Sequence, residues 1–301
     1  MLLPKEFLAK VAGAFGEAGG TWLERLPEKI EEYADKWKLE IEGPAGNLSY
    51  NYVAKARDEN GRPVILKLGV PHHEFINEIR AIKMYNGEGC ARLLKEDGEN
   101  GAMLLEQLIP GRNLAEIEDE KEVVRQYLNV WKAIRRPLPA GHRFPAMRDW
   151  SLALVRYLDT YPNGDGPIGH ADIRKAMGYF QELNDPEQDE LLHGDLHHEN
   201  ILNSETRGWL AIDPKGVAGN PTFDLISFLF NHLHGKPDPR GLLLQRIEWL
   251  CKGLSLNKEK LLKAGFAMST LSACWSIEDN SDWEETYRCG KWFEEILQKG
   301  N

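Results

Sequence analysis

One short segment constrains this chain more than any other. It consists of the apolar pair Leu191-Leu192, the polar loop His193–Asn200, the alternating run Ile201–Ile212, and Asp213. The apolar pair predicts the end of a strand. The alternating run, with small and polar residues at Ser204–Gly208, predicts a β-hairpin that turns there. Such a hairpin returns the chain to its starting point, so Asp213 should lie beside Asn200.

Three side chains in this segment carry oxygen atoms at fixed spacing. Asp195 enters the loop, where its carboxylate can accept the proton of a hydroxyl group, and Asn200 and Asp213 would converge at the base of the hairpin. Two hard oxygen donors suit Mg²⁺. Phosphoryl transfer needs neutralised phosphate charge and an oriented acceptor hydroxyl, and this set supplies both. Asp195 alone would also suit a helix N-cap, but that reading does not explain the other two residues.

The segment resembles the catalytic loop and metal-binding Asp of the protein-kinase-like superfamily, written H-R-D-x-x-x-x-N and D-F-G. Gly194 and Pro214-Lys215 depart from the protein kinases, and no Ala-Pro-Glu motif follows. They match the aminoglycoside and choline phosphotransferase branch. The string from Leu192 to Phe223 looks most like its streptomycin 6-phosphotransferase/hydroxyurea kinase subfamily, and the resemblance extends from about Gly43 to Trp283.

The resemblance implies an α+β, two-lobe fold. Residues 1–106 would form a small lobe with an antiparallel sheet, and residues 107–301 a larger, mainly helical lobe. It also implies an ATP- and Mg²⁺-dependent phosphotransferase with an alcohol group as acceptor, most simply an aminoglycoside such as streptomycin. Two alternatives stay open. One is a kinase for a metabolic sugar, amino sugar or amino alcohol, and the other is a non-catalytic nucleotide-binding protein on the same scaffold.

The spacing of apolar residues agrees with this layout. An Asn-Gly pair at residues 60–61 separates two alternating runs, as in a hairpin. Strands are predicted at 49–57, 63–68, 91–95 and 102–106. Helices are predicted at 5–38, 74–85, 119–136, 148–160, 169–184, 222–234, 240–253 and 257–298.

The first lobe should hold the nucleotide. Lys67 is a lone cation in the apolar strand Val64–Leu68, and burying it requires an anionic partner. Glu78 fits the pairing glutamate of the family better than Glu74, four residues earlier on the same helical face. The alternative is that Lys67 lies on the surface and that this helix face is exposed to solvent.

Three further stretches are predicted to contact the nucleotide or its phosphates. The glycine-containing turn at Gly46-Asn47 lets the backbone approach phosphates, although an ordinary turn would look the same. Glu106 and Leu108 would hold adenine through backbone groups, as the resemblance implies. Lys215, two residues after Asp213, would touch the transferring phosphate or the leaving group, unless it is a solvated lysine in a turn.

Some polar residues near the loop are expected to support it without reacting. His193 should hold the loop by packing and hydrogen bonding, and Asp224 should brace the loop and the start of the next helix. Structural roles also suit His197 and His198, which have no third metal ligand nearby.

Trp275, Glu278 and Asp279 are predicted to bind the acceptor. Carboxylates beside aromatic rings suit cationic, sugar-like ligands, and the subfamily has a similar Trp-x-x-Glu-Asp stretch near its C-terminus. The nearby acids at 282–285 fit a helix N-terminus instead.

Composition limits the partners. The net charge of −10 over 301 residues does not suit nucleic acid or an anionic membrane surface. A small cationic or sugar-like molecule is the expected partner, for a monomer or weak dimer. Four scattered cysteines without zinc spacing, no signal peptide and no apolar stretch long enough to span a membrane predict a cytoplasmic protein.

Overall fold

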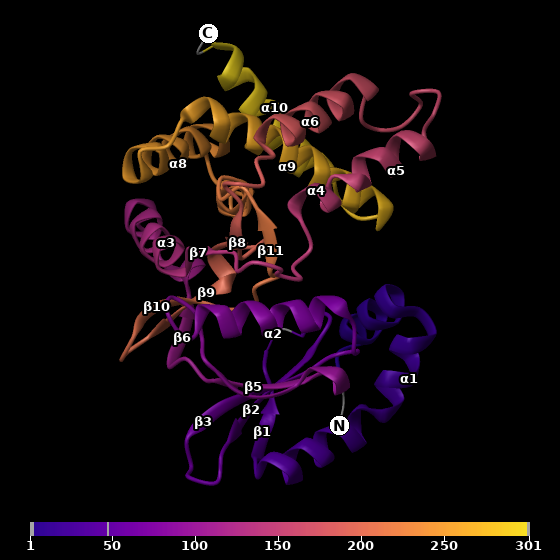
Figure 1. Ribbon diagram of the computed structural model, residues 1–301, viewed down its shortest axis with the longest axis vertical. Coiled ribbons are helices and arrows are strands. Elements are labelled where there is room, and N and C mark those ends of the chain that lie inside the picture. Colours follow the sequence, from indigo (N-terminus) through magenta and orange to yellow (C-terminus); the bar gives the residue numbers. More distant parts are fainter. Residues whose placement is uncertain (1–2, 47, 300–301) are drawn as a thin grey trace. The chain divides into compact units, whose positions relative to one another are not determined.

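The computed structural model describes residues 3–46 and 48–299 (Figure 1). The chain divides into two compact units. Unit 1 comprises Met1–Gly111 and Asn203–Leu210, and unit 2 comprises Arg112–Leu202 and Ala211–Asn301. An antiparallel sheet dominates the first unit and helices dominate the second, which confirms the predicted α+β class.

Unit 1 is built on a five-stranded antiparallel sheet with the strand order β1-β2-β3-β5-β4. The predicted hairpin is present, with Tyr52 opposite Leu68 and Arg57 opposite Pro63. Its turn is closed by Gly61, whose N–H donates to the carbonyl oxygen of Asp58 at 2.8 Å. The strands are β1 Glu40–Pro44, β2 Tyr52–Arg57, β3 Pro63–Leu68, β4 Leu93–Asp97 and β5 Ala102–Glu106.

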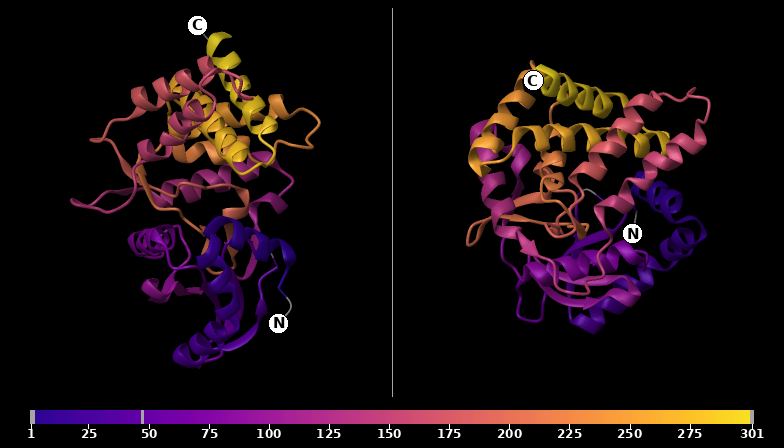
Figure 2. Two further views of the ribbon diagram at one scale, coloured as in Figure 1. Left: turned by 90° about the vertical axis from the view of Figure 1, so that its right-hand side faces the viewer. Right: turned by 45° about the horizontal axis from the view of Figure 1, so that its top comes forward.

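Helix α1 (Lys5–Trp37) supplies one half of the core of unit 1. Its buried residues, such as Trp22 and Tyr33, pack in one cluster with alternate residues of the strands, including Ala54 and Leu66. In Figures 1 and 2 the helix curves along the sheet. The curve contains one non-helical residue, Gly16, at φ 55° and ψ −133°, a conformation that glycine adopts at little cost.

Helix α2 (His73–Tyr85) faces those strand residues that point away from the α1 cluster. Because successive side chains of a strand point to opposite faces, Lys67 points away from the α1 cluster, between the inward-facing Leu66 and Leu68. The helix buries Phe75, Ile79 and Ile82, and it therefore brings its polar residues Asn77 and Glu78 into a buried environment.

Unit 2 is organised around helix α9, which packs against α10 along its length and also against α5, α6 and α7. Figure 2 shows α10, in yellow, alongside α9. One buried charge is notable: Arg246 has no exposed surface, and it donates to the Glu120 carboxylate and to the carbonyl oxygens of Phe228 and Asn231. The α-helices are α3 Glu120–Ile134, α4 Met147–Trp150, α5 Leu152–Thr160, α6 His170–Leu183, α7 Ile226–Phe230, α8 Pro239–Leu254, α9 Lys258–Glu278 and α10 Glu284–Lys299.

Two small sheets complete the structure. One has the order β11-β8-β7, with Val217 opposite Leu192, and the other has the order β10-β9-β6. The second contains the predicted hairpin, because β9 and β10 are neighbours joined by a turn at residues 205–207. The strands are β6 Pro110–Asn113, β7 Arg136–Pro137, β8 Glu190–Leu192, β9 Ile201–Ser204, β10 Gly208–Ala211 and β11 Val217–Gly219.

Two of the predicted helices were wrong in extent. The continuous helix predicted at 257–298 is interrupted between α9 and α10, where Asn280 adopts a left-handed φ of 52°. The helix predicted at 222–234 is reduced to the short 3₁₀ helix Phe223–Leu225 and α7, because Asn231 is extended at ψ 150° and His232 has a φ of 56°.

Candidate active site

The loop that carries Asp195 starts directly after β8. Strand β8 pairs with β11 on one side and with β7 on the other, which fixes the point at which the loop begins. The loop ends in a single turn of 3₁₀ helix at His198–Asn200. The Asp195 side chain is 37% exposed, so its carboxylate is accessible, while His193, two residues before it, and Leu196, the next residue, are buried.

His193 ties the loop to the hairpin. Its ring has no exposed surface. Nε2 lies 2.8 Å from the carbonyl oxygen of Ile212, and Nδ1 lies 3.3 Å from the backbone nitrogen of Asp195. A neutral ring with its proton on Nε2 satisfies both contacts, because it donates to Ile212 and accepts from Asp195. Burial lowers the pKa of His193 to about 4, which favours this neutral form. The predicted supporting role is confirmed.

Asp224 braces the same loop from the other side. Its carboxylate accepts the backbone N–H of Gly194 at 2.7 Å and of His193 at 3.1 Å. Burial raises the pKa of Asp224 to about 6, although these two N–H groups act in the opposite direction. Both peptide groups that precede Asp195 are therefore anchored by one carboxylate, as predicted.

The structure brings Asn200 and Asp213 together at the base of the β9–β10 hairpin. The backbone N–H of Ile212 donates to the carbonyl oxygen of Asn200 at 2.9 Å. The side-chain NH₂ of Asn200 donates to the carbonyl oxygen of Asp195 at 2.9 Å, which turns the amide oxygen the other way. Asp213 has a left-handed φ of 57°, a conformation that Asp tolerates better than most residues.

This donor pair fits a magnesium ion. One amide oxygen and one carboxylate are hard ligands, and Mg²⁺ in phosphotransferases is held by one or two such side chains together with phosphates and water. Within residues 3–46 and 48–299 no group of three or more His, Cys, Asp or Glu is placed to hold a metal ion by itself.

Gly194 explains why this loop lacks the arginine of protein kinases. Its φ is +83°, and a Cβ added there would lie 3.0 Å from the Lys215 Cβ and 3.2 Å from a ring carbon of Trp150. A side chain is opposed both by the positive φ and by these close contacts. Trp150 was not predicted from the sequence, and its position against the catalytic loop makes it part of the candidate site.

Lys215 is held near the loop by its backbone. Its N–H donates to the carbonyl oxygen of His193 at 2.7 Å, and the residue is exposed. The backbone bond places the Lys215 side chain at the edge of the Asp195 loop. Its contact with a phosphate stays a prediction.

In unit 1, Lys67 has the expected partner. Its Nζ donates to Glu78 Oε1 at 2.6 Å, and the two side chains are only 5% and 9% exposed. Glu74 is 64% exposed and faces His72 instead. The prediction of Glu78 over Glu74 as the partner is confirmed, whereas the contact of Lys67 with nucleotide phosphates stays a prediction.

The other predicted nucleotide contacts lie at the ends of strands of unit 1. Gly46 is exposed in the connection between β1 and β2, and Asn47 lies outside the described residues. Glu106 ends β5, and its carboxylate is engaged by the backbone N–H of Arg92 at 2.7 Å and by the Arg207 guanidinium. Leu108 is buried. The backbone contact of these two residues with a base stays a prediction.

The predicted acceptor residues lie at the end of α9. The rings of Trp275 and Trp150 meet edge to face with centroids 5.5 Å apart, so Trp275 is linked through Trp150 to the catalytic loop. Glu278 accepts two hydrogen bonds from the Arg156 guanidinium, each 3.1 Å long. Asp279 is the exposed C-cap residue of α9. The structure thus separates the two acids, since the charge of Glu278 is already balanced by an arginine.

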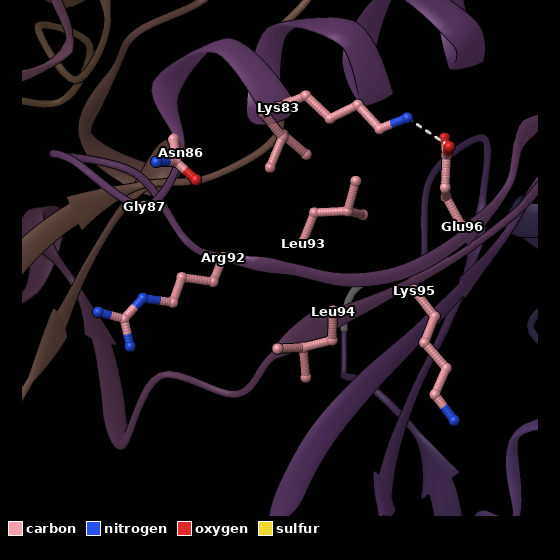
Figure 3. A pocket seen from close by; sticks show the side chains of 9 residues that line it. Lys83, Asn86, Gly87, Arg92, Leu93, Leu94, Lys95 and Glu96 are labelled. Carbon is pink, nitrogen blue, oxygen red and sulfur yellow. Dashed lines mark hydrogen bonds and ion pairs between the residues drawn. The ribbon is translucent and has the colours of Figure 1, made fainter.

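A cavity of about 360 Å³ opens elsewhere on unit 1, between the end of α2 and β4 (Figure 3). The Lys83–Glu96 ion pair lies on one side of it, and Arg92 extends on the other. None of the residues predicted to bind nucleotide lines this cavity. It therefore does not belong to the predicted nucleotide site.

Comparison with known proteins agrees with this geometry. Residues 36–280 match the family described as aminoglycoside/hydroxyurea antibiotic resistance kinase. The chain belongs to that family. It is 30% identical to a streptomycin 6-kinase of Streptomyces glaucescens, over 93% of this chain and 92% of the relative. It is 29% identical to a hydroxyurea phosphotransferase of Kitasatospora aureofaciens, over 92% and 81% of the two chains.

Solved structures show the same fold at low sequence identity. An aminoglycoside phosphotransferase in complex with ADP and hygromycin B is 14% identical, with a TM-score of 0.65 over 90% of this chain and 98% of that one. A choline kinase from Streptococcus pneumoniae is 16% identical, with a TM-score of 0.59 over 90% and 99%. These structures confirm the predicted protein-kinase-like fold, and the family match together with the relatives described above confirms the predicted kinase activity. None of the helices in the described ranges is long and apolar enough to cross a membrane.

Proposed function

We propose that this kinase transfers the γ-phosphoryl group of ATP, as its Mg²⁺ complex, to a hydroxyl group of a streptomycin-like aminoglycoside. The observation that carries the chemistry is the meeting of Asn200 with Asp213 beside the anchored loop of Asp195. The activities of the relatives, streptomycin 6-kinase in two Streptomyces species and streptomycin 3''-kinase in Klebsiella pneumoniae, support the choice of acceptor.

Each type of group that phosphoryl transfer requires can be supplied by a residue of this site. Asn200 and Asp213 would hold Mg²⁺, which neutralises phosphate charge when bound. Lys67, kept in place by Glu78, would contact the α- and β-phosphates. The protein contributes position and charge, because phosphoryl transfer requires little covalent chemistry from the enzyme.

Asp195 would handle the acceptor. Its exposed carboxylate accepts a hydrogen bond from the acceptor hydroxyl and directs the oxygen at the γ-phosphorus. The new P–O bond forms as the bond to the ADP oxygen breaks, and the hydroxyl proton passes to Asp195. The two hydrogen bonds from His193 and Gly194 to Asp224 keep this carboxylate in place.

The acceptor pocket would use the end of α9. Trp150 and Trp275 offer ring faces and edges to a sugar ring, and Asp279 offers a carboxylate to a cationic group. Together with a net charge of −10, this side of the protein favours a cationic acceptor.

The test is turnover by the purified chain. We expect ADP release with ATP, Mg²⁺ and streptomycin, and a single phosphate monoester in the ³¹P NMR spectrum of the product. Asp195→Asn should reduce kcat by at least about 10²-fold while binding ATP as the wild type does. Turnover with choline or glucosamine but not with streptomycin would refute the acceptor. Full activity of Asp195→Asn would refute the role of Asp195.

A further inference from the structure

Two side-chain pairs connect helix α9 to the helices α4 and α5. The first is the edge-to-face contact of Trp150 with Trp275. The ring of Trp150 reaches the space that a Gly194 side chain would fill, so this pair stands directly beside the catalytic loop. The second pair is Arg156 with Glu278. Glu278 follows Trp275 by three residues on the helix, and residues three apart lie on one face. The ion pair is therefore the next contact outward from the tryptophan pair.

The geometry of the second pair is that of a planar fork. The Nε and Nη2 atoms of Arg156 each lie 3.1 Å from a different oxygen of Glu278. This two-point contact is specific to guanidinium, because an ammonium group cannot present two parallel N–H bonds to one carboxylate. A guanidinium group of a ligand would fit Glu278 in the same way.

The pair is also open to exchange. The Arg156 side chain is 57% exposed and the Glu278 side chain 38%, and exposed ion pairs contribute little to stability. Glu278 is the last residue of α9, where the helix dipole favours a cation of any origin. Removing Arg156 from this carboxylate therefore costs little, provided that another cation replaces it.

We propose that Arg156 is an internal substitute for the acceptor, which a guanidinium group of the acceptor displaces from Glu278 during binding. The inference rests on the proposed function and identifies guanidino-bearing aminoglycosides as the preferred substrate class. Arg156 is then a specificity-determining residue. It keeps Glu278 neutralised in the empty enzyme, and it disfavours ammonium-bearing acceptors, which would break a two-point contact and restore only one.

The experiment compares Arg156→Met with the wild type. Methionine keeps an unbranched apolar stem and removes the competing guanidinium. We expect KM for streptomycin, which carries guanidinium groups, to fall by roughly 1.5- to 5-fold, the range that corresponds to losing an exposed competing ion pair. Glu278→Gln should raise KM for streptomycin by at least a similar factor. KM for ATP should be the same in both variants as in the wild type.

Arg240→Met is the matched control. Arg240 and Glu295 form a similarly exposed pair, at 3.2 Å, between α8 and α10. This variant loses one positive charge from the same unit, so it measures the general effect of net charge on binding of a cation. We expect its KM for streptomycin to equal that of the wild type.

The outcomes distinguish the two proposals. If the wild type neither binds streptomycin in calorimetry nor phosphorylates it, the proposed function fails and this inference falls with it. If the wild type is active but Arg156→Met has an unchanged or raised KM, the displacement of Arg156 is refuted and the proposed function stands. An equal fall in KM for Arg156→Met and Arg240→Met would also refute it, because general charge would then explain the effect.

Discussion

Asp224→Asn should change the geometry of the catalytic loop, and with it kcat, while leaving the free energy of unfolding nearly unchanged. Burial raises the pKa of Asp224 from 3.8 to about 6. Each pH unit corresponds to ~1.4 kcal/mol, so at pH 7 the ionised carboxylate costs on the order of 3 kcal/mol relative to a neutral side chain. Asparagine has nearly the same shape and no charge, and it therefore avoids this cost.

The same substitution removes one hydrogen-bond acceptor. The N–H groups of Gly194 and His193 now donate to separate oxygens of Asp224. An amide has one oxygen and turns its NH₂ toward the second donor, and an unsatisfied buried donor costs ~1–3 kcal/mol. The two effects nearly cancel. We expect a free energy of unfolding within ~2 kcal/mol of the wild type, but a kcat lower by roughly 10²-fold because the peptide before Asp195 loses an anchor.

Urea unfolding from pH 4 to 7, together with kcat at saturating ATP, measures both effects. Because the pKa of Asp224 is raised in the folded state, its stabilising contribution is complete below about pH 4 and is lost as the pH rises through 6. The stability difference, wild type minus variant, should therefore fall by roughly 2–3 kcal/mol over this range. The lowered pKa of His193 changes the free energy of unfolding with pH in the opposite direction. This contribution is common to the wild type and the variant, so it cancels in the difference. A loss of more than ~4 kcal/mol at pH 7 would refute the energetic argument, and an unchanged kcat would refute the anchoring argument.

Three further substitutions test other parts of the site and core. Gly194→Ala should lower stability by ~1–3 kcal/mol, and kcat with it, because the positive φ and the contact with Trp150 both oppose a side chain; an unchanged melting temperature would contradict this. Lys67→Met should abolish turnover and cost ~3–5 kcal/mol by removing the cation that faces the buried Glu78 carboxylate. Adding Glu78→Leu should restore stability in urea unfolding but not ADP release, and recovery of both would show that the pair is only structural. Glu120→Gln should cost ~3–5 kcal/mol because Arg246 has no exposed surface; a change below ~1 kcal/mol in thermal unfolding would be inconsistent with that burial.

The sequence predicted those elements whose signals are local. The hairpin of β2 and β3 follows from alternation around Asn60-Gly61, and α1 and α2 follow from helical spacing. Strands β7 and β11 were missed, because two or three residues are too short for alternation to appear. They are strands only through pairing with β8, which is distant in sequence.

The candidate site divides in the same way. Asp195, Asn200 and Asp213 lie within one segment of nineteen residues, so their spacing alone predicted the hairpin that joins them. Trp150 precedes Gly194 by more than forty residues, and Arg156 precedes Glu278 by 122. No local pattern marks such pairs, because Trp150 and Arg156 look like ordinary residues of surface helices. Only packing shows that the charge of Glu278 is already balanced.

The contact between Gly194 and Trp150 also bears on how such an enzyme can be controlled. In protein kinases the position before the catalytic Asp is an arginine, and phosphorylated loops become ordered by pairing with arginines. Here that position carries only a hydrogen atom, and an indole ring occupies the space. A phosphorylated segment would find no guanidinium at this point of the loop, and a side chain introduced there would meet both the positive φ and the close contact with Trp150. An on-switch that pairs a phosphorylated segment with an arginine before the catalytic Asp therefore has no partner at this position of the loop.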